Sequence, residues 1–171
     1  FQMIDKLLEF ITNFWNELMP FFIINDYEQA IILRGGKFKK QLNSGWYLKY
    51  PFYDTVLSAI LTKNTFHVAN VNVTTLDGKT ISVGPIIEYD VADVKKYLLD
   101  VNEAISNAHD VARGIIADYL TDCVWEDVKK KTTLTEIKKK LKTEFSLMGI
   151  NVTKVLFGDI SITRVFTLFR E

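Results

Sequence analysis

An Asp-Gly pair, Asp77-Gly78, lies between two runs of alternating apolar residues, and this pattern constrains the fold more than any other feature of the chain. Asp-Gly favours the positive φ angles of a tight hairpin turn, and alternation with a period of two is typical of strands that bury one face. The alternating residues are Val71, Val73 and Thr75 before the turn and Ile81 and Val83 after it. The sequence therefore predicts an antiparallel hairpin whose second arm continues to Val91, with a bulge or bend at Gly84-Pro85.

Strand signals also fill the segment before this hairpin. Short runs of β-branched and aromatic residues alternate with glycine, asparagine and proline turns, which is typical of an antiparallel sheet. The expected turns are Gly35-Gly36, Asn43-Ser44-Gly45 and the break at Pro51, and the expected strands are residues 27–33, 46–50, 55–61 and 64–73.

Beyond residue 92 the apolar residues recur at three- and four-residue intervals, which indicates helices. One helix has a buried stripe from Ile105 to Leu120, and a second has a stripe from Leu134 to Met148. Thr133-Leu134-Thr135-Glu136 predicts a capping box at the start of the second helix, and Gly149 predicts its end. Strand character returns at Ile150–Phe157. We therefore expect an α+β fold: an antiparallel strand-rich subdomain at residues 22–92, then an α/β subdomain at residues 93–171 with helices and a closing strand.

The apolar pattern of residues 1–21 predicts an N-terminal amphipathic helix that ends at Pro20. Its polar face includes Asp5, Lys6, Glu9 and Glu17, and these charges are not typical of a simple membrane span. Two interpretations remain: a helix packed on the domain's own core, or a helix that lies in the plane of a membrane. The large aromatic apolar face favours the membrane anchor. The residues of that face include Met3, Leu7, Ile11, Phe14, Trp15 and Leu18.

The composition argues against several classes of function. The chain has 21 Lys and Arg against 21 Asp and Glu, so it lacks the basic excess of general nucleic-acid binders. Its single cysteine, Cys123, excludes an internal disulfide and a cysteine-based zinc site. His67 and His109 lack the spacing of metal ligands, and no serine has the spacing of a nucleophile elbow. We expect a non-enzymatic protein with no catalytic, cofactor-binding or metal site, and with no nucleic-acid partner.

Several ordered motifs together resemble the SPFH or band 7 superfamily of stomatins, prohibitins and flotillins. The resemblance covers about residues 22–162, and it departs from the common pattern at Ala30, Gly35, Ser44 and Trp46-Tyr47. The motifs that carry it are the strand and turn at Tyr27–Lys37, the segment Leu42–Tyr47, the Pro-Phe corner Tyr50–Asp54, the hairpin at Asp77-Gly78, and Gly149-Ile150-Asn151-Val152 followed by Asp159-Ile160.

This resemblance implies a membrane-associated scaffold. Identical subunits would assemble side by side, organise lipids, and surround or regulate a membrane protein such as a protease or channel. The expected location is peripheral or monotopic, with the domain on the cytoplasmic side. An alternative is a soluble regulatory adaptor or assembly protein that binds one partner protein without a stable membrane anchor.

The resemblance also places the first strand–turn units and the Pro-Phe corner near the bilayer. Several basic residues lie in these strand–turn units, and each basic residue near an anionic leaflet contributes about 1 kcal/mol to binding. The alternative is a solvated sheet edge whose charges prevent strand pairing. Besides the helix residues given above, the expected membrane contacts are Phe21, Phe22, Lys37, Lys39, Lys40, Pro51 and Phe52.

Overall fold

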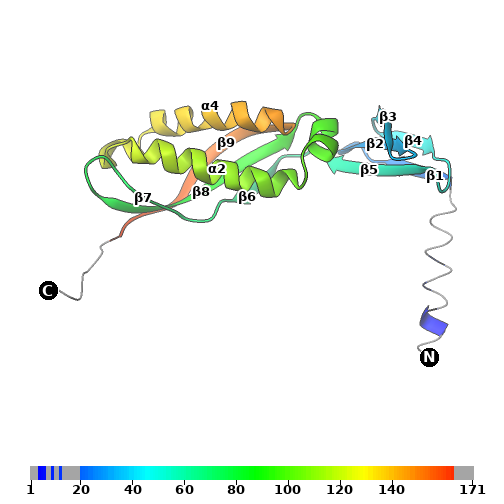
Figure 1. Ribbon diagram of the computed structural model, residues 1–171, viewed down its shortest axis with the longest axis horizontal. Coiled ribbons are helices and arrows are strands. Elements are labelled where there is room, and N and C mark those ends of the chain that lie inside the picture. The colour runs from blue at the N-terminus through cyan, green and yellow to red at the C-terminus, as the bar shows by residue number, and fades with distance from the viewer. Residues whose placement is uncertain (1–3, 7–8, 10–11, 13–19, 164–171) are drawn as a thin grey trace. The chain divides into compact units, whose positions relative to one another are not determined.

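The computed structural model describes residues 4–6, 9, 12 and 20–163. The chain divides into two compact units, Phe1–Thr62 and Lys63–Glu171, here called the N-terminal unit and the C-terminal unit. Figure 1 shows strands in the first unit and two long helices with long strands in the second. Each unit has its own hydrophobic core.

Residues 20–62 of the N-terminal unit form two small antiparallel sheets. In one, β1 (Phe21–Ile24) pairs with β4 (Gly45–Leu48), and this pair is called the ribbon below. In the other, β2 (Glu28–Arg34) lies between β3 (Lys37–Leu42) and β5 (Asp54–Ile60). The two sheets share a core, because side chains from both meet in one buried cluster: Ile24, Ala30, Ile32 and Leu42, with Phe22, Tyr47 and Val56 packed against it.

The C-terminal unit is built around β8 (Thr80–Val91), whose residues alternate between buried and half-buried along its whole length. It pairs antiparallel with β6 (Asn64–His67), β7 (Val71–Thr74) and β9 (Ile150–Ile162).

Four helical segments lie between the strands β8 and β9. They are the π-helix η1 (Lys96–Asp100), α2 (Ala104–Thr121), the short α3 (Trp125–Val128) and α4 (Lys131–Leu147). The two long helices, α2 and α4, lie beside each other over one face of the sheet (Figure 1). Their apolar stripes and the inner face of the sheet form one core, in which Phe145, Ile116 and Ile87 are fully buried.

The α+β fold predicted from the sequence is confirmed, with antiparallel strands followed by helices and a closing strand. The Asp77-Gly78 hairpin joins β7 to β8, and Gly78 has the positive φ of 75° that such a turn needs. The irregularity expected at Gly84-Pro85 is a register shift between β8 and β9.

Two expectations differ from the structure. The chain divides after Thr62 and not at residues 92–93, because β8 pairs with β9 and shares its core with α2 and α4. The capping box predicted at Thr133 is wrong. The α4 helix begins two residues earlier, at Lys131, without a side-chain cap, and the Thr133 hydroxyl instead donates a hydrogen bond of 2.7 Å to the Asp127 carbonyl oxygen.

At the N-terminus, the described residues Ile4, Asp5, Lys6, Glu9 and Thr12 are helical and exposed. No helix within the described part of the chain is long and apolar enough to cross a membrane. The residues of this helix that were predicted to contact the membrane lie outside the described residues: Met3, Leu7, Ile11, Phe14, Trp15 and Leu18.

Candidate membrane-contact surface

The outer face of the β1–β4 ribbon consists of large apolar side chains. Phe21 lies opposite Leu48, and Ile23 lies opposite Trp46. These four side chains are 58%, 66%, 54% and 75% exposed, respectively. Because side chains alternate across a strand, the intervening residues Phe22, Ile24 and Tyr47 point to the other face and pack on the core. The ribbon is therefore apolar on both faces, and its outer face is covered by nothing within the described residues.

The Pro-Phe corner forms a tight turn that projects two aromatic side chains. The amides of Tyr53 and Asp54 donate hydrogen bonds of 3.3 and 3.0 Å to the Tyr50 carbonyl oxygen, which closes the turn. Phe52 has a φ of 68°, a left-handed conformation that is uncommon for a residue other than glycine, and its side chain is 75% exposed. Such backbone strain is often found at functional positions, which makes Phe52 a candidate contact residue.

An ion pair connects this corner to the adjacent strand β2. Arg34 donates from Nε and Nη2 to the two carboxylate oxygens of Asp54, at 2.7 and 2.9 Å. Asp54 also accepts a hydrogen bond from the Tyr50 amide at 3.0 Å, and the Arg34 guanidinium lies 4.6 Å from the centre of the Tyr50 ring. The hydrogen bonds from Arg34, and then that from Tyr50, lower the pKa of Asp54 to about 2. Arg34 is thereby held in a defined orientation.

A pocket of about 530 Å³ lies between the end of the ribbon and strands β2 and β3. It is called the basic pocket below, because four cationic side chains line it: Arg34, Lys39, Lys40 and Lys49. The apolar residues Ile32 and Leu48 also line it. The Lys40 ammonium lies 5.7 Å from the centre of the Tyr47 ring. Among the residues that the structure describes, no carboxylate lies within ion-pair distance of Lys39, Lys40 or Lys49.

The residues that the sequence indicated as membrane contacts are only partly brought together. Phe21 lies on the outer ribbon face, but Phe22 is half-buried against the core, with its ring 5.8 Å from that of Tyr47. Pro51 and Phe52 form the corner, and Lys39 and Lys40 line the basic pocket. Lys37 lies at the start of the same strand and is exposed, but it does not line the pocket.

Ile23, Trp46 and Leu48 were missed by the sequence reasoning. The strands β1 and β4 read Phe-Phe-Ile-Ile and Gly-Trp-Tyr-Leu, so both faces of each strand are apolar. Alternation, the usual signal that separates an outward face from an inward one, is absent from such strands. Only the position of the core identifies the exposed set.

The histidine and cysteine side chains singled out in the sequence do not form a catalytic or metal-binding cluster among the described residues. His109 packs against Phe66, with ring centres 4.4 Å apart, and burial raises the pKa of the Cys123 thiol above its usual value. In the described ranges, no cluster of three His, Cys, Asp or Glu residues is placed to hold a metal ion.

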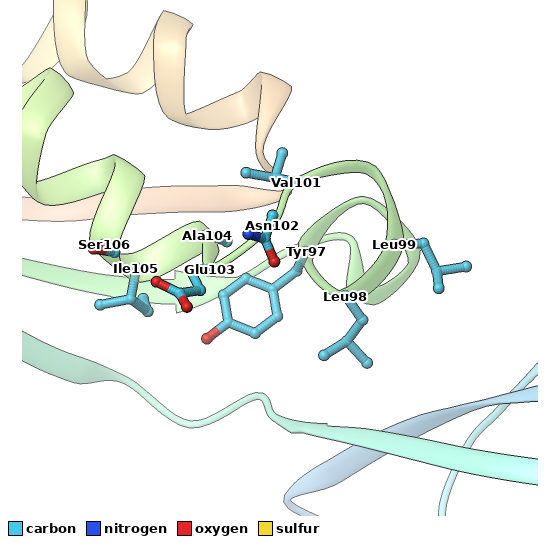
Figure 2. Close-up of a pocket in the computed structure, with 9 residues that line it drawn as sticks. All are labelled: Tyr97, Leu98, Leu99, Val101, Asn102, Glu103, Ala104, Ile105 and Ser106. Carbon is cyan, nitrogen blue, oxygen red and sulfur yellow. The ribbon is translucent and has the colours of Figure 1, made fainter.

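A further pocket, of about 460 Å³, lies between η1 and the first turn of α2 (Figure 2). Its lining includes Tyr97, Leu98, Glu103 and Ser106, and burial raises the pKa of Tyr97. Glu103 is the one ionic side chain among its lining residues, and no histidine or lysine accompanies Ser106 as a base. These residues give no nucleophile–base pair.

An antiparallel strand-rich unit, followed by helices and a closing strand, defines a two-unit α+β domain. The chain belongs to the SPFH domain / Band 7 family, whose model matches residues 22–167. It is 27% identical over 142 residues to an uncharacterized protein of Methanocaldococcus jannaschii, a match that covers 81% of this chain and 70% of the relative. It is 22% identical over 142 residues to an uncharacterized protein of Archaeoglobus fulgidus, and this match covers 82% of the chain but only 57% of that relative.

Proposed function

We propose that this protein is a membrane-associated scaffold whose N-terminal unit lies on a lipid leaflet. The observation that carries the proposal is the outer face of the ribbon, where Phe21, Ile23, Trp46 and Leu48 expose only apolar side chains. Exposed apolar surface of this kind marks sites that contact lipid or protein. At the level of the family, the SPFH domain supports a membrane-associated scaffold that is generally not an enzyme.

The energetics favour weak binding by one copy and firm binding by several. Full burial of a large apolar side chain is worth about 1.5–3 kcal/mol, and the ribbon side chains already have part of their surface covered. Each nearby lysine adds about 1 kcal/mol on an anionic leaflet. The loss of translational and rotational freedom on binding offsets much of this gain. Linked copies avoid most of that loss after the first contact, so oligomerisation multiplies the affinity.

The proposal extends to the predicted N-terminal helix and to the partners. Residues 1–21 would lie in the plane of one leaflet and add their apolar face to that of the ribbon. Identical subunits would then assemble side by side, on the cytoplasmic side of the membrane, and surround a membrane protein such as a protease or channel. A soluble adaptor that binds one partner protein is the competing function, and the ribbon face would then be its protein-binding surface.

Flotation tests the proposal directly. The full chain is mixed with vesicles of neutral lipid or of neutral lipid with an anionic phospholipid, and the floated fraction is measured after centrifugation. We expect flotation with both compositions, and more with the anionic one. Light scattering coupled to size exclusion, in detergent and without it, should detect oligomers. A monomer under both conditions that stays at the bottom of the gradient would contradict the scaffold and favour the adaptor.

A further inference from the structure

We propose that the basic pocket binds the phosphate group of an anionic ligand, and that the source of this phosphate is the glycerophosphate headgroup of a phospholipid. The inference deepens the proposed membrane association and rests on it for the source of the ligand. The pocket's location supports this source, because Leu48 both lines the pocket and belongs to the outer face of the ribbon.

The charge balance of the pocket calls for an anion. Of the four cations that line it, Arg34 is neutralised by Asp54, while Lys39, Lys40 and Lys49 have no carboxylate within ion-pair distance in the part of the chain that the structure describes. Like charges that line one concave site repel each other and raise the local potential, which attracts an anion. A phosphate group would relieve this repulsion and accept hydrogen bonds from the ammonium groups.

Arg34 is oriented for a second role. A guanidinium has five N–H donors, and Asp54 takes one from Nε and one from Nη2. Three N–H donors remain, and they make no hydrogen bond to another side chain among the described residues. Because Asp54 and the Tyr50 ring hold the guanidinium in place, little side-chain entropy is lost when these donors bind an anion.

The shape and the apolar part of the pocket favour a headgroup over a bare ion. A volume of about 530 Å³ falls within the range of small-ligand sites and exceeds what a single phosphate needs. Ile32 and Leu48 supply apolar contacts that a glycerol backbone can use and that inorganic phosphate cannot. From the pocket, the acyl chains of a lipid could continue along the outer ribbon face, where Phe21 lies opposite Leu48.

The test uses the full chain and compares the double substitution Lys40→Gln/Lys49→Gln with the single control Lys37→Gln. Lys37 lies on the same strand as Lys40 and is exposed, but it does not line the pocket. We measure binding to phosphatidylcholine vesicles that contain either phosphatidylglycerol or an equal mole fraction of an anionic lipid with a carboxylate headgroup. Thermal unfolding checks that each variant is folded.

We expect the pocket variant to lose at least about a hundredfold in affinity for phosphatidylglycerol vesicles, and Lys37→Gln about fivefold. General electrostatic attraction accounts for a loss of only about fivefold per lysine. The pocket variant should lose more than this, because direct charge-assisted hydrogen bonds are lost as well. On carboxylate vesicles the pocket variant should lose only about fivefold per lysine. Equal losses per lysine for all variants on both vesicle types would overturn the inference, and flotation of the wild-type protein would still stand.

An experiment without vesicles distinguishes a lipid headgroup from a free phosphate compound as the ligand. It also tests the pocket separately from the proposed membrane association. Glycerol phosphate and short-chain phosphatidylglycerol are titrated into the protein without vesicles, and the intrinsic tryptophan fluorescence is followed. A lipid headgroup is supported if the short-chain lipid binds at a concentration at least about tenfold lower than glycerol phosphate does, and if Lys40→Gln/Lys49→Gln abolishes this binding. Equal binding of both ligands would overturn the lipid source. If the short-chain lipid binds while the wild-type protein fails to float on any vesicle, the pocket is confirmed and the proposed membrane association is wrong.

Discussion

Ile23 on β1 lies directly opposite Trp46 on β4, and both side chains point away from the core onto which Phe22 and Tyr47 pack. This pairing places apolar surface on both faces of a two-stranded ribbon. A ribbon of this kind is stable in water only because its inner face is covered, and its outer face remains available for a lipid leaflet or a protein.

Substitution of the outer pair should separate membrane binding from folding. We expect Ile23→Ser/Trp46→Ser to bind vesicles about tenfold to hundredfold more weakly, since the exposed parts of two large apolar side chains, whose full burial would be worth about 1.5–3 kcal/mol each, are removed. Exposed side chains contribute little to the folded state, so the free energy of unfolding should change by less than about 1 kcal/mol. The matched control is Leu76→Ser/Leu147→Ser, which removes two exposed leucines from the C-terminal unit. Equal losses in both variants, measured by vesicle flotation, would contradict the assignment.

Phe52→Gly should weaken membrane binding without weakening the fold. The left-handed backbone costs a non-glycine residue about 1–2 kcal/mol, while glycine in place of a larger residue costs about 0.5–1 kcal/mol in chain entropy. The two effects nearly cancel, so the free energy of unfolding in urea should stay the same or rise slightly. Loss of the exposed ring should lower vesicle affinity about tenfold. A large loss of stability would show that Phe52 is held in this conformation by packing and not for contact.

Gly149→Ala should destabilise the C-terminal unit strongly. Gly149 has a φ of 76°, and a Cβ added there would lie 2.3 Å from the Asp93 carbonyl oxygen and 2.9 Å from the Tyr97 nitrogen. The backbone must shift, and the hydrogen bonds that the Ala92 and Asp93 amides donate to the Gly149 carbonyl would be disturbed. We expect a loss of about 2–4 kcal/mol in urea unfolding.

The control for this variant is Gly114→Ala, in the exposed middle of α2. A Cβ at Gly114 meets no atom within 4 Å, and alanine is the better helix former. This variant should be more stable than wild type by about 0.5–1 kcal/mol. A similar loss in both variants would show that the close approach of Gly149 to Asp93 is not the cause.

The stability of the protein should fall as the pH drops from about 4 to about 2. Hydrogen bonds hold the pKa of Asp54 and of Asp77 at about 2, below the ordinary value of about 3.9. A carboxylate with a lowered folded-state pKa binds fewer protons folded than unfolded in this range, so its stabilisation is fully present above about pH 4 and is lost as the pH falls through about 2. Urea unfolding at several pH values measures this slope.

Asp54→Asn should flatten the dependence, because asparagine does not titrate and cannot form the ion pair with Arg34. The remaining slope should be that of Asp77, whose carboxylate accepts hydrogen bonds from the Thr75 hydroxyl and the Trp125 amide and pairs with Lys79. An unchanged slope in Asp54→Asn would contradict a stabilising role for the Arg34–Asp54 pair.

Much of the fold could be predicted because its signals are local. The positive φ at Gly78 and Gly149, the alternation around the hairpin and the apolar stripes of α2 and α4 each depend on residues a few positions apart. The start of α4 could not be predicted in this way, because the Thr133 hydroxyl donates to the Asp127 carbonyl oxygen in the short helix α3, so the expected capping box is not formed.

By itself, the sequence determined the α+β order of elements and the hairpin at Asp77-Gly78, because these follow from side-chain periodicity and from the backbone preferences of glycine. The resemblance of its ordered motifs also indicated the family, which the family model confirms. Only the tertiary structure decided which apolar residues of the ribbon are exposed, that Arg34 pairs with Asp54, and that Asp77 bonds the Trp125 amide 48 residues away. The physical reason is that burial and pairing depend on which elements pack together. A strand that is apolar on both faces, such as Phe21–Ile24, carries no local sign of the face that meets the core.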